Sequence, residues 1–121
     1  LMIGNQRVTL EDVSVLRKGD ILSVAIDTLP CANLKKIAQD ARLFLCESTY
    51  LEEHKHLAKS HSHLTAKQAA QVAKEAGVYD LVLTHFSARY QELTAFEQEA
   101  KELFLRTTVA EDLKQIPFTR S

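Results

Sequence analysis

Alternation between short apolar segments and helix-like segments constrains the fold of this chain more than any other feature. Three continuous apolar runs of strand length occur at 21–26 (ILSVAI), 43–46 (LFLC) and 81–84 (LVLT), and a fourth short segment at 107–110 (TTVA). Continuous apolar runs are typical of strands covered on both faces. Strands that alternate with helices of about ten residues favour right-handed crossovers. The sequence therefore predicts an α/β fold with a largely parallel sheet.

Capping residues predict where the helices begin. The clearest helix spans 66–76, where Thr65 and Gln68 match a capping box and Gly77 provides the stop. The other predicted elements are a helix over 34–41 capped by Asn33, a helix from 94 to about 104 with a Thr94–Glu97 capping box, a weak helix or exposed loop over 51–61, one or two half-exposed strands within 1–20, and an edge strand or tail over 113–118.

Composition narrows the class of protein. With 121 residues, 45% apolar and 26% charged, the chain suits one soluble domain or part of a larger one. A formal net charge of -1 excludes a general nucleic-acid binder, so any RNA contact must be local. The two cysteines, Cys31 and Cys46, lack zinc-knuckle spacing and favour a reducing cytoplasm. No apolar run approaches the roughly 20 residues of a membrane span, and Leu1 in place of Met suggests a processed chain or fragment.

Chemically active side chains follow three of the predicted strands. Asp27 follows ILSVAI, Glu47 follows LFLC and His85 follows LVLT. Each residue taken singly is more often structural, as a turn cap, an ion pair or a hydrogen-bonded histidine. Parallel strands, however, end at one edge of a sheet, where open α/β sheets bind ligands. The coincidence of three such residues therefore predicts a functional site at that edge.

The remaining histidines lie within ten residues, at His54, His56, His61 and His63. Their polar surroundings and divergent spacing fit a solvated surface better than a metal site. His63 differs because it directly precedes the predicted helix start and can be held by a rigid element. Arg89, four residues after His85, offers a planar fork of donors for a phosphate. Together with the strand-end residues, this set fits metal-assisted hydrolysis of a phosphate ester.

The segments AIDT, CEST, HLTAKQAA and LVLTHFSARY occur in this order, and TVAEDLKQI closes the chain. In order and approximate spacing they resemble the C-terminal part of the ribonuclease Z family, the transfer-RNA 3'-processing endonucleases of the metallo-β-lactamase fold. The resemblance covers roughly Gly4 to Ile116. It implies the C-terminal half of a four-layer αββα sandwich, with one sheet and its packed helices.

The resemblance also implies roles for individual residues. Asp27 matches the aspartate that bridges a pair of zinc ions, and His85 matches the last histidine ligand. His63 matches the histidine that protonates the leaving oxygen, and Glu47 the glutamate that orients it. Arg89 matches an arginine that contacts phosphate. The implied function is zinc-dependent removal of the 3' trailer of precursor transfer RNA, in the cytoplasm, by a protein that is a homodimer when complete.

The sequence departs from the family pattern in four respects. Cys46 stands where the family motif has His, and Leu64 stands where it has Ser. The ligand motif H-x-H-x-D-H, which belongs to the N-terminal half of the fold, and the arm that grips transfer RNA have no match in this chain. Two protein ligands cannot hold a pair of zinc ions tightly. We therefore expect residues 1–121 to form the C-terminal part of the domain and, alone, not to cleave RNA.

Two other functions remain open at the level of sequence. The chain could be a noncatalytic α/β binding or assembly module in which Asp27, Glu47 and His85 stabilise loops, as the missing ligand motif would suggest. It could also be another hydrolase of the metallo-β-lactamase fold that acts on a different phosphodiester or ester. Metal analysis separates the enzyme from the module, and a substrate panel separates the two kinds of enzyme.

Overall fold

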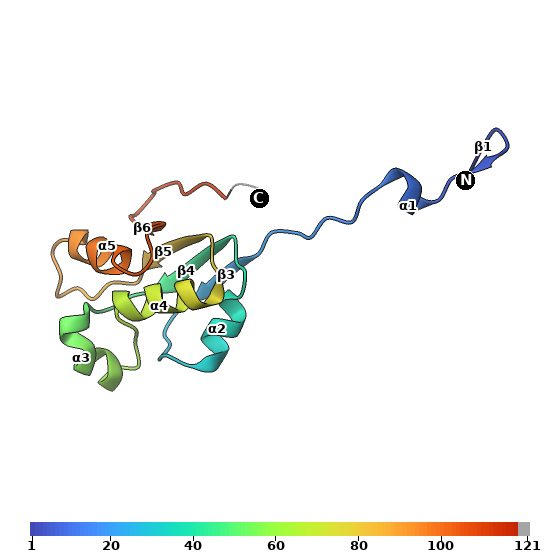
Figure 1. The fold of residues 1–121 in the computed structure, drawn as a ribbon. Helices are drawn as coiled ribbons and strands as arrows, with labels where there is room; N and C mark the ends of the chain where they lie inside the picture. Colours follow the sequence, from blue (N-terminus) through green and yellow to red (C-terminus); the bar gives the residue numbers. More distant parts are fainter. Residues whose placement is uncertain (119–121) are drawn as a thin grey trace.

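A computed structural model describes residues 1–118 of the chain (Figure 1). Its main sheet has four strands in the order β3-β4-β5-β6, and every neighbouring pair is parallel. The prediction of an α/β fold with a parallel sheet is therefore confirmed. The strands are β3 (Leu22–Ala25), β4 (Leu43–Glu47), β5 (Asp80–Thr84) and β6 (Thr107–Val109).

Three helices pack side by side against one face of this sheet, with α4 between α2 and α5 (Figure 1). Their alanines let the helix backbones approach the sheet and each other closely. Phe44 of β4 and Phe96 of α5 fill the larger spaces, and both are fully buried. The helices are α2 (Ala32–Ala38), α4 (Ala66–Ala76) and α5 (Thr94–Lys101), and the alanines buried in α4 are Ala66, Ala69, Ala70, Ala73 and Ala76.

Helix α4 begins and ends where the sequence predicts. The Thr65 hydroxyl accepts a hydrogen bond from the Gln68 N–H, and the Gln68 side chain accepts one from the Thr65 N–H, at 3.1 and 2.9 Å. Gly77 ends the helix with a φ of 70°, which a glycine adopts without strain. This rigid helix fixes the position of the residues just before it, including His63.

Strand register places the candidate residues at one edge of the sheet. Cys46 of β4 is paired with Ala25 of β3 on one side and with Leu83 of β5 on the other. The next one or two residues along each strand therefore lie level with one another. Asp27, Glu47 and His85 occupy these positions, as the sequence predicts.

The smaller elements differ more from the predictions. The expected one or two strands within residues 1–20 occur as two short strands, although both are exposed rather than half-exposed. A capping box at Thr9 then starts a single helical turn that the sequence does not predict. Residues 51–61 are helical, as one of the two expectations had it, and residues 113–118 contain no strand. These elements are β1 (Met2–Ile3), β2 (Gln6–Arg7), α1 (Leu10–Val13), η1 (Glu52–His54) and α3 (Lys55–Ser60).

Two predicted caps are also wrong. Helix α2 starts after Cys31, so Asn33 lies inside the helix, and it ends at Ala38 rather than near 41. Leu93, not Thr94, is the N-cap of α5, and no side chain caps this helix. In both cases the preceding loop sets the start of the helix, and local capping chemistry does not override it.

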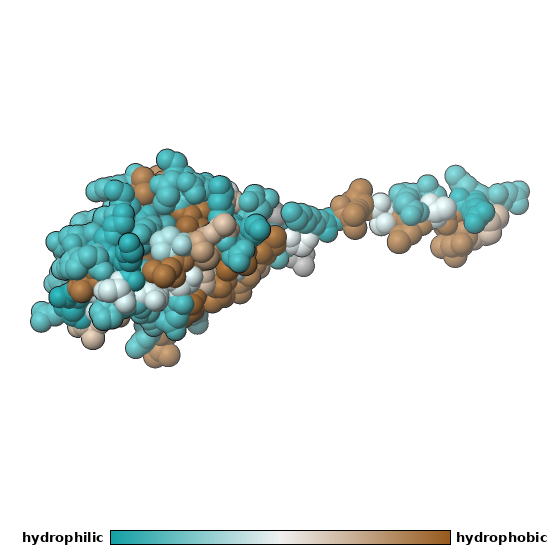
Figure 2. Space-filling view, turned by 90° about the horizontal axis from the view of Figure 1, so that it is seen from below, coloured by the Kyte–Doolittle hydropathy of each residue, from teal (hydrophilic) through white to brown (hydrophobic). Residues whose placement is uncertain are grey.

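The outer face of β3 is exposed, although the sequence predicts a strand covered on both faces. Leu22 and Val24 on that face are 59% and 50% exposed, whereas Ser23 and Ala25 are buried against the helices. β3 is an edge strand, and no layer covers its outer face within residues 1–118. Figure 2 shows hydrophobic residues gathered on the body and again along the N-terminal segment, which extends away from it in Figure 1. No helix within residues 1–118 has the length and apolar character to cross a membrane.

Candidate functional site

The Asp27 carboxylate and the His85 imidazole meet just beyond the ends of β3 and β5. Asp27 Oδ1 lies 3.4 Å from His85 Nε2. Both residues have left-handed backbone conformations, with φ of 52° and 60°. Such conformations cost a non-glycine residue about 1 kcal/mol or more and are concentrated at functional sites. Here they turn the chain at the end of each strand, so that two side chains distant in sequence face each other.

Glu47 is the buried centre of the site. Its side chain has no exposed surface, and its carboxylate accepts hydrogen bonds from the backbone N–H groups of Thr28, Thr49 and Leu64 at 2.9, 3.3 and 3.1 Å. A buried carboxylate is stable only when its oxygens are paired in this way. Glu47 thereby connects the loop after β3, the end of β4 and the loop before α4.

His63 is held by Glu47 and faces the Asp27–His85 pair. Its Nδ1 lies 3.0 Å from Glu47 Oε1 and 3.9 Å from Asp27 Oδ1. The rings of His63 and His85 are 5.4 Å apart. Because Glu47 can only accept when ionised, His63 Nδ1 donates to it. The other ring nitrogen, Nε2, is then available to transfer a proton.

Thr49 joins Glu47 to His85. The sequence does not single out this residue. Its hydroxyl lies 2.8 Å from Glu47 Oε2 and 3.1 Å from His85 Nδ1. A hydroxyl has one proton, which goes to the carboxylate, so it must accept from His85 Nδ1–H. In a neutral His85 ring the lone pair is then on Nε2, which lies 3.4 Å from Asp27 Oδ1. The available sequence signal is that Thr49 follows Glu47 by two residues, at the same edge of the sheet.

The side chains of Asp27, His63 and His85 can offer ligands to one cation. One ligand atom from each lies within 4.8 Å of the others. Carboxylate and imidazole are ligands that zinc prefers, and the lone pair on His85 Nε2 is directed appropriately. Asp27 and His85 therefore fit a zinc ion, whereas His63 Nδ1 is engaged by Glu47. Zinc usually takes about four ligands, so two protein ligands leave positions for water or for further protein ligands.

The structure does not bring all predicted residues into this cluster. Arg89 is exposed in the loop after β5, and no hydrogen bond or ion pair among residues 1–118 joins its side chain to the cluster. His56 and His61 are exposed, as expected for a solvated surface. His54 is partly buried instead, and its Nδ1 lies 2.6 Å from the Tyr90 hydroxyl. Burial raises the pKa of that Tyr90 hydroxyl.

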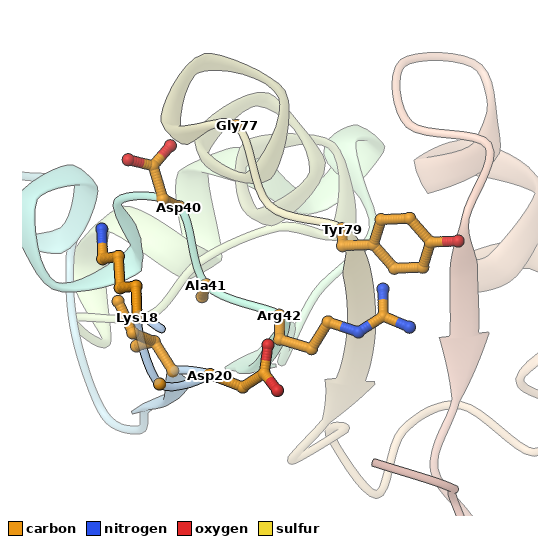
Figure 3. Close-up of a pocket in the computed structure, with 9 residues that line it drawn as sticks. Lys18, Asp20, Asp40, Ala41, Arg42, Gly77 and Tyr79 are labelled. Carbon is orange, nitrogen blue, oxygen red and sulfur yellow. The ribbon is translucent and has the colours of Figure 1, made fainter. Parts of the chain in front are cut away.

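The opposite edge of the sheet contains a hollow of about 570 Å³ (Figure 3). It lies where the chain enters β4 and β5, and none of the predicted site residues lines it. The Arg42 guanidinium stacks on the Tyr79 ring there, 3.6 Å from its centre. This edge carries a cation–π stack, whereas the candidate site lies at the edge where the strands end.

Known proteins with similar sequences are named ribonuclease Z. No family model matches the chain. Ribonuclease Z of Protochlamydia amoebophila is 62% identical over 120 residues, which are 99% of this chain and 39% of that protein. Ribonuclease Z of Chlamydia caviae is 53% identical over 119 residues, which are 98% of this chain and 39% of that protein. This chain thus spans about two fifths of the length of the ribonuclease Z sequences that it matches.

Solved structures show that the chain has part of the metallo-β-lactamase fold. The human tRNase Z short form is 35% identical, with a TM-score of 0.55 over 71% of this chain and 28% of that one. A metallo-β-lactamase fold protein from Bacillus subtilis has a TM-score of 0.69 over 74% of this chain and 36% of that one, at 23% identity. The second likeness concerns the fold alone.

The departures from the ribonuclease Z motifs do not disturb the cluster. Cys46 is fully buried, burial raises the pKa of its thiol, and its side chain belongs to the core beneath the helices. Leu64 is also fully buried, and its backbone N–H rather than its side chain binds Glu47. Both positions therefore accept an apolar residue without changing how Glu47 and His63 are held.

Proposed function

We propose that this chain supplies the C-terminal part of the active site of a zinc-dependent endoribonuclease that removes the 3' trailer of precursor transfer RNA. One observation carries the proposal: Asp27, Glu47, His63 and His85 converge at one edge of the sheet although they span nearly sixty positions. The similarity to ribonuclease Z sequences supports the substrate. The chain alone is not expected to cleave RNA, because it offers too few ligands for a zinc pair.

The proposed roles follow from the hydrogen bonds of each side chain. Asp27 and His85 Nε2 hold metal, and Thr49 fixes the His85 ring by accepting from Nδ1–H. Glu47 accepts from His63 Nδ1–H and so orients the ring and stabilises its protonated form. His63 then gives the Nε2 proton to the oxygen that leaves phosphorus, while Arg89 is proposed to contact the phosphate. Zinc bound here would activate a water molecule and offset the charge of the phosphate.

The metal, compartment and assembly are part of the same proposal. Zinc suits the carboxylate–imidazole ligand set better than magnesium, which prefers oxygen ligands alone. A reducing cytoplasm suits two unpaired cysteines, of which Cys31 is exposed. A homodimer of the complete protein follows from the family resemblance, and light scattering of the complete protein tests it.

Cleavage by a hybrid protein tests the function. In this hybrid, the 120 matching residues of the Protochlamydia amoebophila ribonuclease Z are replaced by those of this chain. The hybrid should release the 3' trailer from a precursor transfer RNA when zinc is present and not when it is chelated. Asp27→Ala and His85→Ala should each lower kcat/KM by more than about a hundredfold, because each removes a metal ligand.

Two results would contradict the proposal. Full activity in both variants would show that neither side chain holds the catalytic metal. An inactive hybrid, beside an active and unmodified Protochlamydia protein, would show that this chain is not a competent half of the enzyme. Circular dichroism of each variant serves as the control for folding.

A further inference from the structure

A small hollow adjoins the proposed acid His63 on the side where α3 begins. It has a volume of about 270 Å³. It is smaller than the roughly 300–1,000 Å³ of most drug-sized sites, so it suits one base with its sugar rather than a duplex. The lining residues are Leu29, Pro30, Lys55, Lys59, His63 and Gln68.

Apolar and cationic side chains are separated within this hollow. Leu29 and Pro30, in the loop between β3 and α2, provide an apolar surface. Lys55 and Lys59 are four residues apart on α3, so they share one face of the helix. Lys55 has a weak ion pair with Glu52 at 3.6 Å, and no ion pair within residues 1–118 involves Lys59. An apolar surface beside two exposed ammonium groups complements a nucleotide, with its flat base and its anionic phosphate.

Gln68 adds a donor to the same hollow. Its Oε1 accepts from the Thr65 N–H, which fixes the side chain. Its Nε2 makes no hydrogen bond to another residue in the described part of the chain. A fixed amide with free N–H groups can donate to a base edge or to a ribose hydroxyl. The chain has a net charge of -1, so this local positive surface is the kind of RNA contact that its composition permits.

The position of His63 decides which nucleotide the hollow receives. In hydrolysis of a phosphodiester, water attacks phosphorus, the bond from phosphorus to the leaving oxygen breaks, and that oxygen takes a proton. One product keeps the phosphate and the other keeps a hydroxyl. His63 stands between the hollow and the Asp27–His85 pair, and it is the proposed donor of that proton. The nucleotide that keeps the hydroxyl therefore lies on the side of His63 where the hollow is.

We infer that this hollow, between the 29–30 loop and α3, is the subsite for the nucleotide that carries the leaving oxygen. Lys55 and Lys59 contact the RNA backbone, Leu29 and Pro30 contact the base, and Gln68 donates to it. The inference deepens the proposed function and rests on it. The subsite does not include Arg89, which lies in the loop after β5.

Binding of RNA to the metal-free hybrid tests the lysines. The probe is a fluorescent minihelix RNA with a short 3' trailer, and its Kd is measured in EDTA at several salt concentrations. Lys55→Gln and Lys59→Gln together should weaken binding and lower the slope of log Kd against log salt by about two, or about one for each phosphate contact. Lys74→Gln is the matched control, because Lys74 is exposed in the last turn of α4 and does not line the hollow.

Abasic RNA tests which nucleotide the hollow holds. Two further probes lack the base immediately before or immediately after the cut, and end-group analysis shows which product keeps the hydroxyl. Removing the base on the hydroxyl side should weaken binding about fivefold. The variant Leu29→Ala should weaken binding of the intact probe similarly but add little to that abasic probe, because both changes remove the same contact.

The outcomes separate this inference from the proposed function. A hybrid that cleaves precursor RNA but binds with the same salt slope after the double lysine change as after Lys74→Gln would overturn the subsite alone. The subsite would also be overturned if Leu29→Ala added little to the loss caused by removing the base on the phosphate side, because Leu29 would then contact that base. A hybrid that neither cleaves nor binds the RNA would overturn the proposed function and the subsite with it.

Discussion

At the scale of single residues, the Thr49 hydroxyl connects Glu47 to His85. It donates to Glu47 and accepts from His85, at 2.8 and 3.1 Å. The same proton assignment leaves a lone pair on Nε2 of a neutral His85 ring for the proposed metal, and it gives the Glu47 carboxylate, which binds His63, one more hydrogen bond. Mutation of a residue that orients a metal ligand without touching the metal typically lowers metal affinity or activity by about 10- to 100-fold.

Replacing the Thr49 hydroxyl tests this linkage. We expect Thr49→Val to lower kcat/KM of the hybrid by about tenfold and to weaken its zinc affinity, because the His85 ring loses the acceptor that fixes it. Thr49→Ser keeps a hydroxyl and should stay within about twofold of the unmodified hybrid on the same grounds. Equal activity and zinc affinity in the valine and unmodified proteins would show that the hydroxyl does not position His85.

Residues of the cluster differ in how far the sequence predicts them. The sequence predicts Asp27, Glu47 and His85, because each comes just after a predicted strand and a parallel sheet brings the ends of its strands together. His63 follows only from its place before a capped helix and from the family resemblance. Thr49 is not predicted, because threonine after a strand is common and only the coordinates show that its hydroxyl lies between two ionisable groups.

At the scale of elements, helix starts show when local capping chemistry decides and when it does not. Thr65 caps α4, and its hydroxyl also donates to Glu52 at 2.7 Å, which ties the helix to η1. Thr94 has the same capping-box pattern three residues before a glutamate, yet Leu93 occupies the N-cap position of α5. Both segments have the same capping-box pattern, so the difference in where each helix starts comes from the loop that precedes it.

These two threonines form a matched pair for a stability measurement. Thr65→Ala should lower the free energy of unfolding of the chain by about 1–2 kcal/mol, because it removes a buried cap and its bond to Glu52. Thr94→Ala should change it by less than about 0.5 kcal/mol, as for a surface site without a special contact. Urea unfolding followed by circular dichroism measures both. Equal losses would mean that the Thr65 cap does not hold α4.

At the scale of the whole molecule, the outer face of β3 is exposed within residues 1–118. The sequence predicts a strand covered on both faces, and the run ILSVAI retains that composition although Leu22 and Val24 are exposed here. The prediction is wrong for residues 1–118, where no layer covers that face of β3. The chain matches 39% of the Protochlamydia amoebophila ribonuclease Z, and we propose that a complete protein covers the face with a layer from the remaining part.

A single charge on this face should therefore have opposite effects in two proteins. In the chain alone, Val24→Lys should reduce self-association measured by light scattering, because a lysine on an edge strand opposes pairing between sheets. In the hybrid, the same change should lower the melting temperature, because the lysine would be buried under the N-terminal half. Ile37→Lys is the control, since Ile37 is 49% exposed and Val24 50%. Loss of hybrid stability with both variants alike would contradict a covered β3 face.

The position of zinc tests the central claim most directly. A crystal of the hybrid grown with zinc, measured at the zinc absorption edge, should show an anomalous peak bound by an Asp27 carboxylate oxygen and by Nε2, not Nδ1, of His85, at about 2.0–2.2 Å. Such a peak would confirm that the two strand ends form one metal site with the hydrogen-bond pattern set by Thr49. Zinc bound elsewhere, with Asp27 and His85 outside its coordination sphere, would contradict the account.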